Sequence, residues 1–433
     1  MAPWCEVQTT GVKLSLRRHE WESLPGLASE TLLPHHGPMQ HGNRILELAQ
    51  ACIHCGLCLE ACPTWQLTGR EDFSPRGRIR AVVGATRGEV SVPQVLPALD
   101  ACLGCRACET ACPSGVRYGE LLEVARAEVL EPARPWSWRR LVWRPLIRHV
   151  LPHRHRFGLL LWPVRVLARL GWRARLPFVG RLVGMLPPPS SATRKFTGGV
   201  PGSGARRAVL LEGCAMPVVY PGVLRASERL LESAGFRVER ATSGCCGALE
   251  AHDGARERAM GRVRRVLEGL VERDVVITEA AGCGAHLKAH RASRHPEVLD
   301  LSEALLTAGW TPRRPLEGAE GGPLRVAYQD PCHLLHGQGL QGPARELLER
   351  AGATVLPVAD AGRCCGGAGT HAFLQPQAAD RLGQAKWDDL VRSAPEVIVT
   401  SNPSCQMQLE AARRHNGGRP EILHLAEVLA RTL

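Results

Sequence analysis

Two runs of four cysteines limit what this chain can fold into more than any other feature. The first run is Cys52-x2-Cys55-x2-Cys58-x3-Cys62-Pro63, and the second is Cys102-x2-Cys105-x2-Cys108-x3-Cys112-Pro113. This spacing is typical of bacterial ferredoxins, in which the fourth cysteine of each run ligates the other cluster. We therefore predict two [4Fe–4S] clusters, ligated by Cys52, Cys55, Cys58 and Cys112 (first cluster) and by Cys62, Cys102, Cys105 and Cys108 (second cluster).

Zinc and disulfides explain the two runs less well. Structural zinc sites need only four ligands and rarely use three cysteines at this spacing. Disulfides between cysteines three residues apart on helical turns would constrain nothing. The first twenty residues contain no apolar signal segment, which favours a reducing, cytoplasmic compartment where clustered cysteines bind metals or do redox work.

The segments around the two runs are predicted to be helical. ILELAQACIHC (45–55) and YGELLEVARAEVL (118–130) carry apolar residues at helical spacing, and no alternating strand pattern is visible between them. We expect an all-α two-cluster ferredoxin module over residues 45–131. Residues 1–44 are expected to be a loosely structured arm whose lone Cys5 has no role.

An internal repeat organises the second half of the chain. RLLESAG (229–235) matches ELLERAG (346–352), and DVVITEAAGC (274–283) matches EVIVTSNPSC (396–405), with three further matched blocks in the same order. Short β-branched segments alternate with helical ones in both copies, which predicts α/β domains with a largely parallel sheet. We expect two such domains, at residues 206–318 and 319–433.

Each copy carries four cysteines of its own. They are Cys214, Cys245, Cys246 and Cys283 in the first copy, and Cys332, Cys364, Cys365 and Cys405 in the second. Adjacent cysteines on one strand would face opposite sides of a sheet, so each Cys-Cys pair fits a loop that offers both sulfurs to one ligand. A further iron–sulfur cluster, a structural zinc and a packing role all stay open for these cysteines. His252, His333, His336 and His371 lie near them in the sequence, either as proton-handling groups or as polar surface residues.

Each copy resembles the CCG cysteine-rich domain of heterodisulfide-reductase-type proteins. The last cysteine of that motif is missing in both copies, because His286 and Gln408 stand in its place. In those relatives the full set of cysteines holds a non-cubane cluster. This chain lacks the full set, which argues against a cluster of that kind here.

Residues 45–433 as a whole resemble the iron–sulfur subunits of glycolate oxidases. The resemblance rests on CIHCGLCLEACPTWQLTG, SPRGRI, ETACPSGVRYG, LLEGCAMP, GCCGA and CCGGAG, in this order. It implies a subunit of a 2-hydroxy acid oxidoreductase with no catalytic residue or substrate site of its own. Partner subunits with FAD would take electrons from glycolate, and this chain would pass them toward a quinone or another acceptor.

Residues 132–205 form a basic segment and linker. No Asp or Glu occurs from Pro132 to Leu211, which holds 16 Lys and Arg, so the rest of the chain is net negative although the whole chain is +12. Five of the ten tryptophans lie here too. Arginine and tryptophan on apolar stripes suit an anionic membrane surface. We expect residues 136–186 to hold the protein on the inner face of the cell membrane without spanning it, or to dock on a flavin subunit, rather than to bind nucleic acid.

Three other functions stay open from the residues. The same electron-transfer task fits a lactate or glycerol-3-phosphate dehydrogenase, because a partner would select the substrate. A self-contained disulfide reductase at the paired cysteines is a second alternative, disfavoured by the missing fifth cysteines. A zinc-stapled scaffold or nucleic-acid adaptor is a third.

Overall fold

The computed structural model describes residues 8–9, 12–13, 40–132, 138–169, 177–187, 206–241 and 244–433. Residues 41–433 form one compact unit and residues 1–40 another. In the smaller unit, β1 (Gln8–Thr9) pairs antiparallel with β2 (Val12–Lys13). Residues 40–44 of the expected N-terminal arm belong to helix α1 (Gln40–Gln50), and the rest of the arm, including Cys5, lies outside the described residues. The division into five domains stays a prediction.

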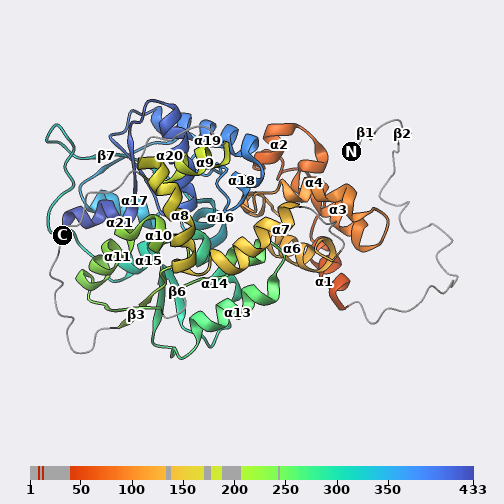
Figure 1. The fold of residues 1–433 in the computed structure, drawn as a ribbon, viewed down its shortest axis with the longest axis horizontal. Helices are drawn as coiled ribbons and strands as arrows, with labels where there is room; N and C mark the ends of the chain where they lie inside the picture. Colours follow the sequence, from red (N-terminus) through yellow and green to blue (C-terminus); the bar gives the residue numbers. More distant parts are fainter. Residues whose placement is uncertain are drawn as a thin grey trace. The chain divides into compact units, whose positions relative to one another are not determined.

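Residues 40–132 contain helices and loops and no strand (Figure 1). The helices are α1 (Gln40–Gln50), α2 (Pro63–Thr68), α3 (Pro75–Thr86), α4 (Val92–Asp100), α5 (Ala107–Thr110) and α6 (Tyr118–Ala125), with short turns η2 (Glu71–Phe73) and η3 (Arg126–Leu130). Proline begins α2 and α3, where its missing N–H costs nothing. Ser74 caps α3 by accepting a hydrogen bond from the Gly77 N–H at 3.0 Å. Ile45, Val82 and Leu99 are fully buried in the core of this module.

The first copy of the repeat folds as a four-stranded parallel sheet. Its strands are β3 (Arg207–Leu210), β4 (Arg237–Arg240), β5 (Val275–Thr278) and β6 (Glu297–Asp300), in the order β4-β3-β5-β6. Its helices are α10 (Met216–Val219), α11 (Pro221–Ser233), α12 (Ala248–His252), α13 (Arg256–Leu267), α14 (Ala281–His290) and α15 (Leu301–Thr307). All four residues of β5 are buried, as expected for a central parallel strand covered on both faces.

The second copy repeats this topology. Its strands are β7 (Arg325–Gln329), β8 (Thr354–Leu356), β9 (Val397–Thr400) and β10 (Glu421–His424), in the order β10-β9-β7-β8, all parallel. Its helices are α16 (Cys332–Gln338), α17 (Pro343–Arg350), α18 (His371–Leu374), α19 (Pro376–Val391), α20 (Pro403–His415) and α21 (Leu425–Leu429), followed by the turn η5 (Ala430–Thr432). The prediction of parallel sheets with helices in the repeat is therefore confirmed.

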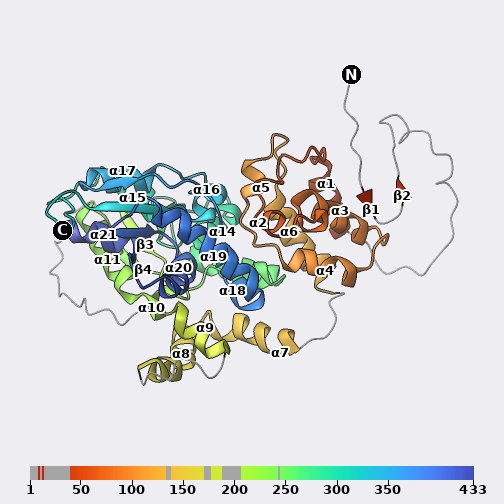
Figure 2. The ribbon, with the colours of Figure 1, turned by 90° about the horizontal axis from the view of Figure 1, so that it is seen from above.

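The two copies share one hydrophobic core. Leu230 of α11, Leu305 of α15, Leu347 of α17 and Val428 of α21 belong to a single cluster of buried side chains. Figure 2 shows β3 and β4 between helices on either side. A shared core of this size holds the two copies as one body.

Four helical pieces of the basic segment are described. They are α7 (Trp138–Pro145), η4 (Leu146–Val150), α8 (Arg154–Arg169) and α9 (Pro177–Met185). Ile147, Leu161 and Met185 are buried, so these helices are packed on the folded body rather than detached from it. No helix in the described part of the chain has the length and apolar character needed to cross a membrane.

Candidate metal centres

The first cysteine run lies in the loop that joins α1 to α2. Gly56 has φ of +89°, a conformation that L residues with a side chain rarely adopt, and this turn folds the run back on itself. Arg76 of α3 steadies the turn by donating to the backbone carbonyl of His54 at 3.0 Å. Cys55 is exposed, whereas Cys62 is buried at the start of α2.

The second run lies between α4 and α6. Gly104 and Arg106 both have φ of +64°, and the short helix α5 carries Cys108. Cys105 and Cys108 are buried. The second run is therefore enclosed by protein to a greater extent than the first.

The electrostatic neighbours of the cysteines cross between the two runs. Burial raises the pKa of Cys52, and Cys112 of the other run is the thiol that raises it most. Burial likewise raises the pKa of Cys108, and its neighbours include Cys62 of the first run. Cys62 also adds to the raised pKa of Cys105. Cys112 is thus an electrostatic neighbour of the first run and Cys62 of the second, although Cys62 also acts on Cys58 of its own run.

The cysteines fit iron–sulfur ligation chemically. Each of the sixteen cysteines in the described part of the chain is a free thiol, so none is committed to a disulfide there. Thiolate sulfur is the ligand that [4Fe–4S] clusters use. The residues present therefore match the expected clusters in ligand type.

A buried arginine lies against the second group of cysteines. Arg78 is almost completely buried and donates hydrogen bonds to the Ala98 carbonyl at 2.7 Å, to Thr64 Oγ1 at 2.8 Å and to Cys62 Sγ at 3.8 Å. Burial alone would lower the pKa of Arg78, but Cys102 and other anionic neighbours outweigh burial and raise it. The guanidinium therefore stays charged inside the module.

Arg78 and two other side chains act on Cys102. Burial raises the pKa of this thiol, but Arg78 and Arg126 outweigh burial and leave the pKa below its usual value. Tyr118 donates its hydroxyl to Cys102 Sγ at 3.6 Å. Sequence reasoning missed Tyr118, because nothing in the pattern shows which aromatic side chain reaches a sulfur.

The four cysteines of the first copy meet at the carboxyl ends of its strands. Cys246 Sγ lies 3.1 Å from Cys283 Sγ at the start of α14. A hydrogen bond between Cys214 and Cys245 raises the pKa of Cys214, and burial raises it further. All four predicted cysteines are therefore brought together in neighbouring pairs.

The four cysteines of the second copy are grouped in the same way. Hydrogen bonds with Cys332 and Cys365 raise the pKa of Cys364, and a hydrogen bond with Cys365 raises the pKa of Cys405. Asn402 also donates to Cys405 Sγ at 3.2 Å. Both Cys-Cys pairs are followed by a glycine with positive φ.

A buried lysine distinguishes the second copy from the first. Lys386 is fully buried and donates to the carbonyls of Asp360 and Ala361 at 2.8 and 2.6 Å. It is one of the groups that lower the pKa of Cys365, after the hydrogen bonds from Cys364 and Cys405. Gly247 packs against Ala259 in the first copy, as Gly366 packs against Ala379 in the second, so the two alanines are equivalent positions. Lys386 follows its alanine by seven residues, and the residue at the same distance in the first copy is Val266.

The second copy packs directly on the loop of the second cysteine run. His333 Nε2 lies 2.8 Å from the Gly104 carbonyl oxygen, and His336 Nδ1 lies 2.9 Å from Thr110 Oγ1. Cys332 is the thiol that raises the pKa of Cys105 most, after burial. A cluster of buried apolar side chains joins the same two parts, and its members are Leu103, Cys105, Cys364 and Leu382.

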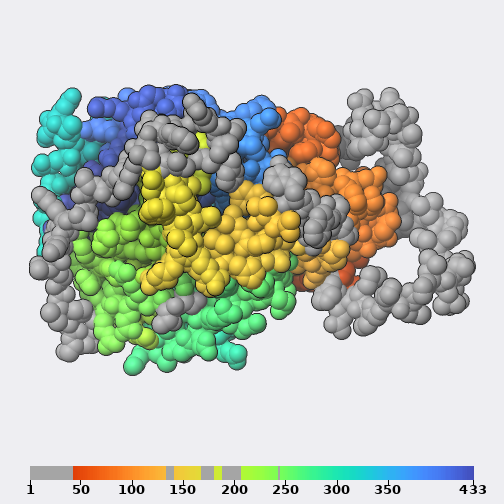
Figure 3. Space-filling view, viewed as in Figure 1, coloured from red at the N-terminus to blue at the C-terminus, as the bar shows by residue number. Residues whose placement is uncertain are grey.

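Some side chains of the basic segment contact the repeat, and others are exposed to solvent. Arg154 donates to Glu212 Oε2 at 3.1 Å and Arg181 to Asp380 Oδ2 at 2.8 Å, so acidic groups of the repeat neutralise part of its charge. Leu159 and Trp162 of α8, in contrast, are 75 % and 64 % exposed. Figure 3 shows this segment in yellow on the surface of the face in view.

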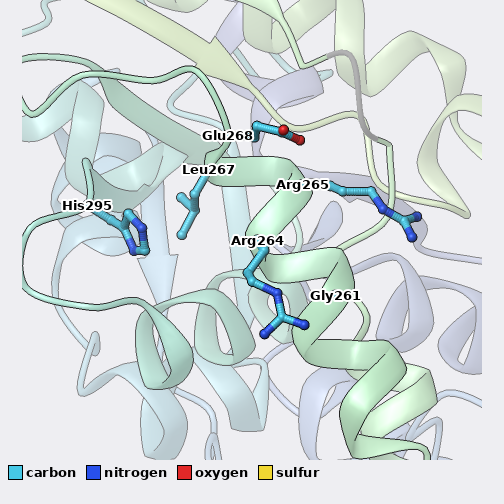
Figure 4. Close-up of a pocket in the computed structure, with 6 residues that line it drawn as sticks. All are labelled: Gly261, Arg264, Arg265, Leu267, Glu268 and His295. Atoms are coloured by element: carbon cyan, nitrogen blue, oxygen red, sulfur yellow. The ribbon is translucent and has the colours of Figure 1, made fainter.

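A pocket of about 440 Å³ lies beside α13, and no cysteine is among its lining residues (Figure 4). Its lining includes Arg264, Arg265, Glu268 and His295. The two arginine side chains point in different directions and do not converge on a common anion position. We assign no substrate to this pocket.

Comparisons with known proteins agree with this layout. Residues 48–116 match the family model described as 4Fe-4S dicluster domain, and residues 208–288 and 326–410 match the model described as cysteine-rich domain. The chain is 35 % identical over 419 residues to the glycolate oxidase iron–sulfur subunit of Escherichia coli K12, covering 91 % of this chain and 97 % of that protein.

Two further relatives are similar to this chain at lower identity. A probable glycolate oxidase iron–sulfur subunit of Bacillus subtilis 168 is 29 % identical over 416 residues, covering 87 % of this chain and 92 % of that protein. Lactate utilization protein A of an Exiguobacterium species is 24 % identical over 237 residues, covering 50 % of this chain and 94 % of that protein. The similarity to the first two relatives extends over nearly the whole chain.

Proposed function

The chain belongs to the family of glycolate oxidase iron–sulfur subunits, and we propose that it is the electron-transfer subunit of a glycolate-type 2-hydroxy acid oxidase. Partner subunits that carry FAD would oxidise the hydroxy acid. This chain would receive the electrons and deliver them to a quinone or another acceptor. The substrate and the flavin are thus assigned to the partners.

Two cluster sites carry the proposal. Cys52, Cys55, Cys58 and Cys112 would hold the first cluster, and Cys62, Cys102, Cys105 and Cys108 the second. The observation that supports it best is the crossed grouping, in which Cys112 is a neighbour of Cys52 while Cys62 is a neighbour of Cys108. A [4Fe–4S] cluster, when bound, supplies the uptake and release of single electrons.

Side chains of this chain affect how readily the second site takes up an electron. Arg78 and Arg126 bring positive charge to the second site, and Tyr118 donates a hydrogen bond to Cys102. Each of these groups favours the more negative state of a sulfur-ligated site, because positive charge and hydrogen-bond donors stabilise it. The second site is therefore arranged to favour electron uptake.

The second copy of the repeat is the better candidate for a further cluster. Its Cys332 lies next to Cys105 of the second site, and buried Lys386 supplies positive charge to Cys365. The first copy has Val266 in place of that lysine. Zinc remains the alternative occupant of both sets of cysteines.

The first cluster site lies at the surface, which suits exchange of electrons with a partner. Cys55 is exposed, and Ile53 and Leu57 beside it are 65 % and 61 % exposed. Apolar side chains exposed around a site are typical of protein docking surfaces. We place the flavin subunit here.

A second surface carries the proposal of membrane attachment. The exposed side chains of Leu159 and Trp162 lie among the arginines of α8, a combination that suits an anionic lipid surface. We propose that this surface holds the complex on the inner face of the cell membrane.

Lactate is the second candidate substrate of the complex. The observation in favour of lactate is that a relative named lactate utilization protein A matches half of this chain. Because the proposal places substrate binding on the flavin partner, the two candidates differ in the partner and not in this chain.

Anaerobic co-purification of the chain with its flavin partners tests the proposal. We expect a brown complex with about eight irons per chain for two clusters, or about twelve with a further one. Glycolate should reduce the clusters, as seen by electron paramagnetic resonance (EPR), and lactate should do so less well. A colourless chain that contains zinc and no iron would refute the proposal.

A further inference from the structure

Three metal-ligating side chains converge away from the cysteines, between α6 of the ferredoxin module and α14 of the first copy. Glu123 lies on α6, and His286 and His290 lie one turn apart on α14. One ligand atom from each of the three lies within 4.8 Å of the other two. Nε2 of His290 is 3.1 Å from Oε2 of Glu123, and the two imidazole centroids are 4.6 Å apart.

One ring nitrogen of this group has no hydrogen-bond partner in the described part of the chain. His286 is only 6 % exposed, and its Nε2 has no partner among the described residues. Buried ring nitrogens are normally satisfied, so an unpaired one beside a carboxylate and a second imidazole is available to a ligand. The spacing His286-x3-His290 places both rings on the same face of one helix, as in helical zinc motifs.

The ionisation states suit a cation. Burial and then the neighbouring His290 lower the pKa of His286 to about 4, so at neutral pH this ring is uncharged and keeps a free lone pair. Burial would raise the pKa of Glu123, but the hydrogen bond with His290 and the other histidines lower it to about 2. Glu123 is therefore a carboxylate at neutral pH.

We propose that Glu123, His286 and His290 bind one zinc ion. Two imidazole nitrogens and one carboxylate oxygen form an ordinary zinc donor set, with the fourth position left to water. Zinc also outcompetes Fe²⁺ for such nitrogen and oxygen sites in the general affinity order. Bound there, zinc ties α6 to α14 and so joins the ferredoxin module to the first copy.

This site is separate from the iron–sulfur sites. Cys283 precedes His286 by three residues but pairs with Cys246 at 3.1 Å, and neither thiol belongs to the group of three. The zinc site and the clusters can therefore succeed or fail independently. Iron content reports on the clusters, and zinc content with its ligand type reports on this site.

The test uses the full chain, purified anaerobically, incubated with zinc chloride and desalted. Zinc and iron are counted by mass spectrometry, and X-ray absorption at the zinc edge separates nitrogen and oxygen ligands near 2.0 Å from sulfur near 2.3 Å. The variants are His290→Asn and Glu123→Gln, both close to the native shape. His415→Asn on exposed His415 is the matched control.

We expect roughly one zinc per chain with nitrogen and oxygen ligands in the wild type and in His415→Asn. In His290→Asn and Glu123→Gln the content of this zinc per chain should fall at least tenfold, while the iron content stays unchanged. Retained nitrogen- and oxygen-ligated zinc in both variants, zinc bound only through sulfur, or no zinc in the wild type would each overturn the proposal. The unchanged iron content shows that a variant has folded.

Discussion

Arg78 keeps a positive charge inside the ferredoxin module, where a charge is costly unless it is paired. Its hydrogen bonds to the Ala98 carbonyl and Thr64 hold it beside Cys62. An interaction of this kind favours whichever state of the neighbouring sulfurs is more negative. Its removal should therefore be measurable as a change in reduction potential.

Arg78→Gln should lower the midpoint potential of the second cluster by about 65–130 mV. A charged hydrogen bond contributes about 1.5–3 kcal/mol, and for one electron 59 mV corresponds to a tenfold change in equilibrium. EPR-monitored redox titration measures the shift. Arg80→Gln, on an exposed position of the same helix, should change the potential little. An equal shift in both variants would contradict a specific role for Arg78.

The crossed ligands can be tested with two reciprocal pairs of variants. Cys62→Ala should give the EPR spectrum of Cys108→Ala, because both would remove a ligand of the second cluster. Cys112→Ala should give the spectrum of Cys58→Ala, because both would affect the first. If Cys62→Ala instead matched Cys58→Ala, each run would hold its own cluster and the assignment would be wrong.

Buried Glu279 makes stability depend on pH. Burial raises its pKa to about 8, and the nearby carboxyl of Asp300 adds to this increase. Between pH 4.5 and 8 the unfolded chain releases this proton while the folded chain keeps it, so the free energy of unfolding falls as pH rises through that window.

Glu279→Gln should flatten that dependence and stabilise the fold at pH 8 by about 2–4 kcal/mol. The melting temperature of wild type and variant, followed from pH 5 to 8.5, measures the effect. Glu268→Gln, at an exposed carboxylate, should leave the wild-type slope intact. Parallel curves for wild type and Glu279→Gln would contradict the raised pKa.

Helix α8 shows what an apolar pattern in a sequence can and cannot predict. Apolar residues recur at helical spacing in the basic segment, and helices are present there. The pattern did not show that Leu161 faces the protein core while Leu159 and Trp162 face outward, because that choice depends on a partner surface distant in the sequence. The central strand β5 was predictable because its β-branched run VVIT is buried on both faces.

The outward face of α8 can be tested by substitution, whereas deletion of the segment would open the core around Leu161. Leu159→Gln combined with Trp162→Gln should reduce recovery with membranes at least tenfold, since each apolar side chain contributes about 1.5–3 kcal/mol when buried. Sedimentation with anionic vesicles measures this. Val271→Gln, at a residue 52 % exposed elsewhere, is the control. Unchanged sedimentation would refute membrane attachment by α8.

Considered as a whole molecule, the chain has two kinds of cluster environment. The first site is exposed, with Ile53 and Leu57 beside it, and the second is enclosed by the second copy of the repeat. The cysteine spacing predicted both ligand sets but not this difference. Contacts such as Glu123 with His290, 167 residues apart, likewise arise only from tertiary packing.

Ile53→Ser combined with Leu57→Ser should weaken the complex with the flavin subunits by at least tenfold, because both side chains would be buried at the interface. Co-purification yield and the rate of glycolate-dependent cluster reduction measure the effect, with iron content as the check on folding. The α8 double variant should keep the complex intact. Full recovery of the complex with the Ile53 and Leu57 variant would place the flavin subunit elsewhere.

The enclosure of the second site also fixes an order of assembly. Cys62, Cys105 and Cys108 are buried, and the hydrogen bond from His333 to Gly104 closes the second copy over their loop. A machinery that delivers preformed clusters needs access to the thiols it loads. We expect the second cluster to be inserted while the nascent chain is still open, before the repeat docks. The first cluster, with its exposed Cys55, can be replaced in the finished protein, so repair after oxidative damage should be confined to that end.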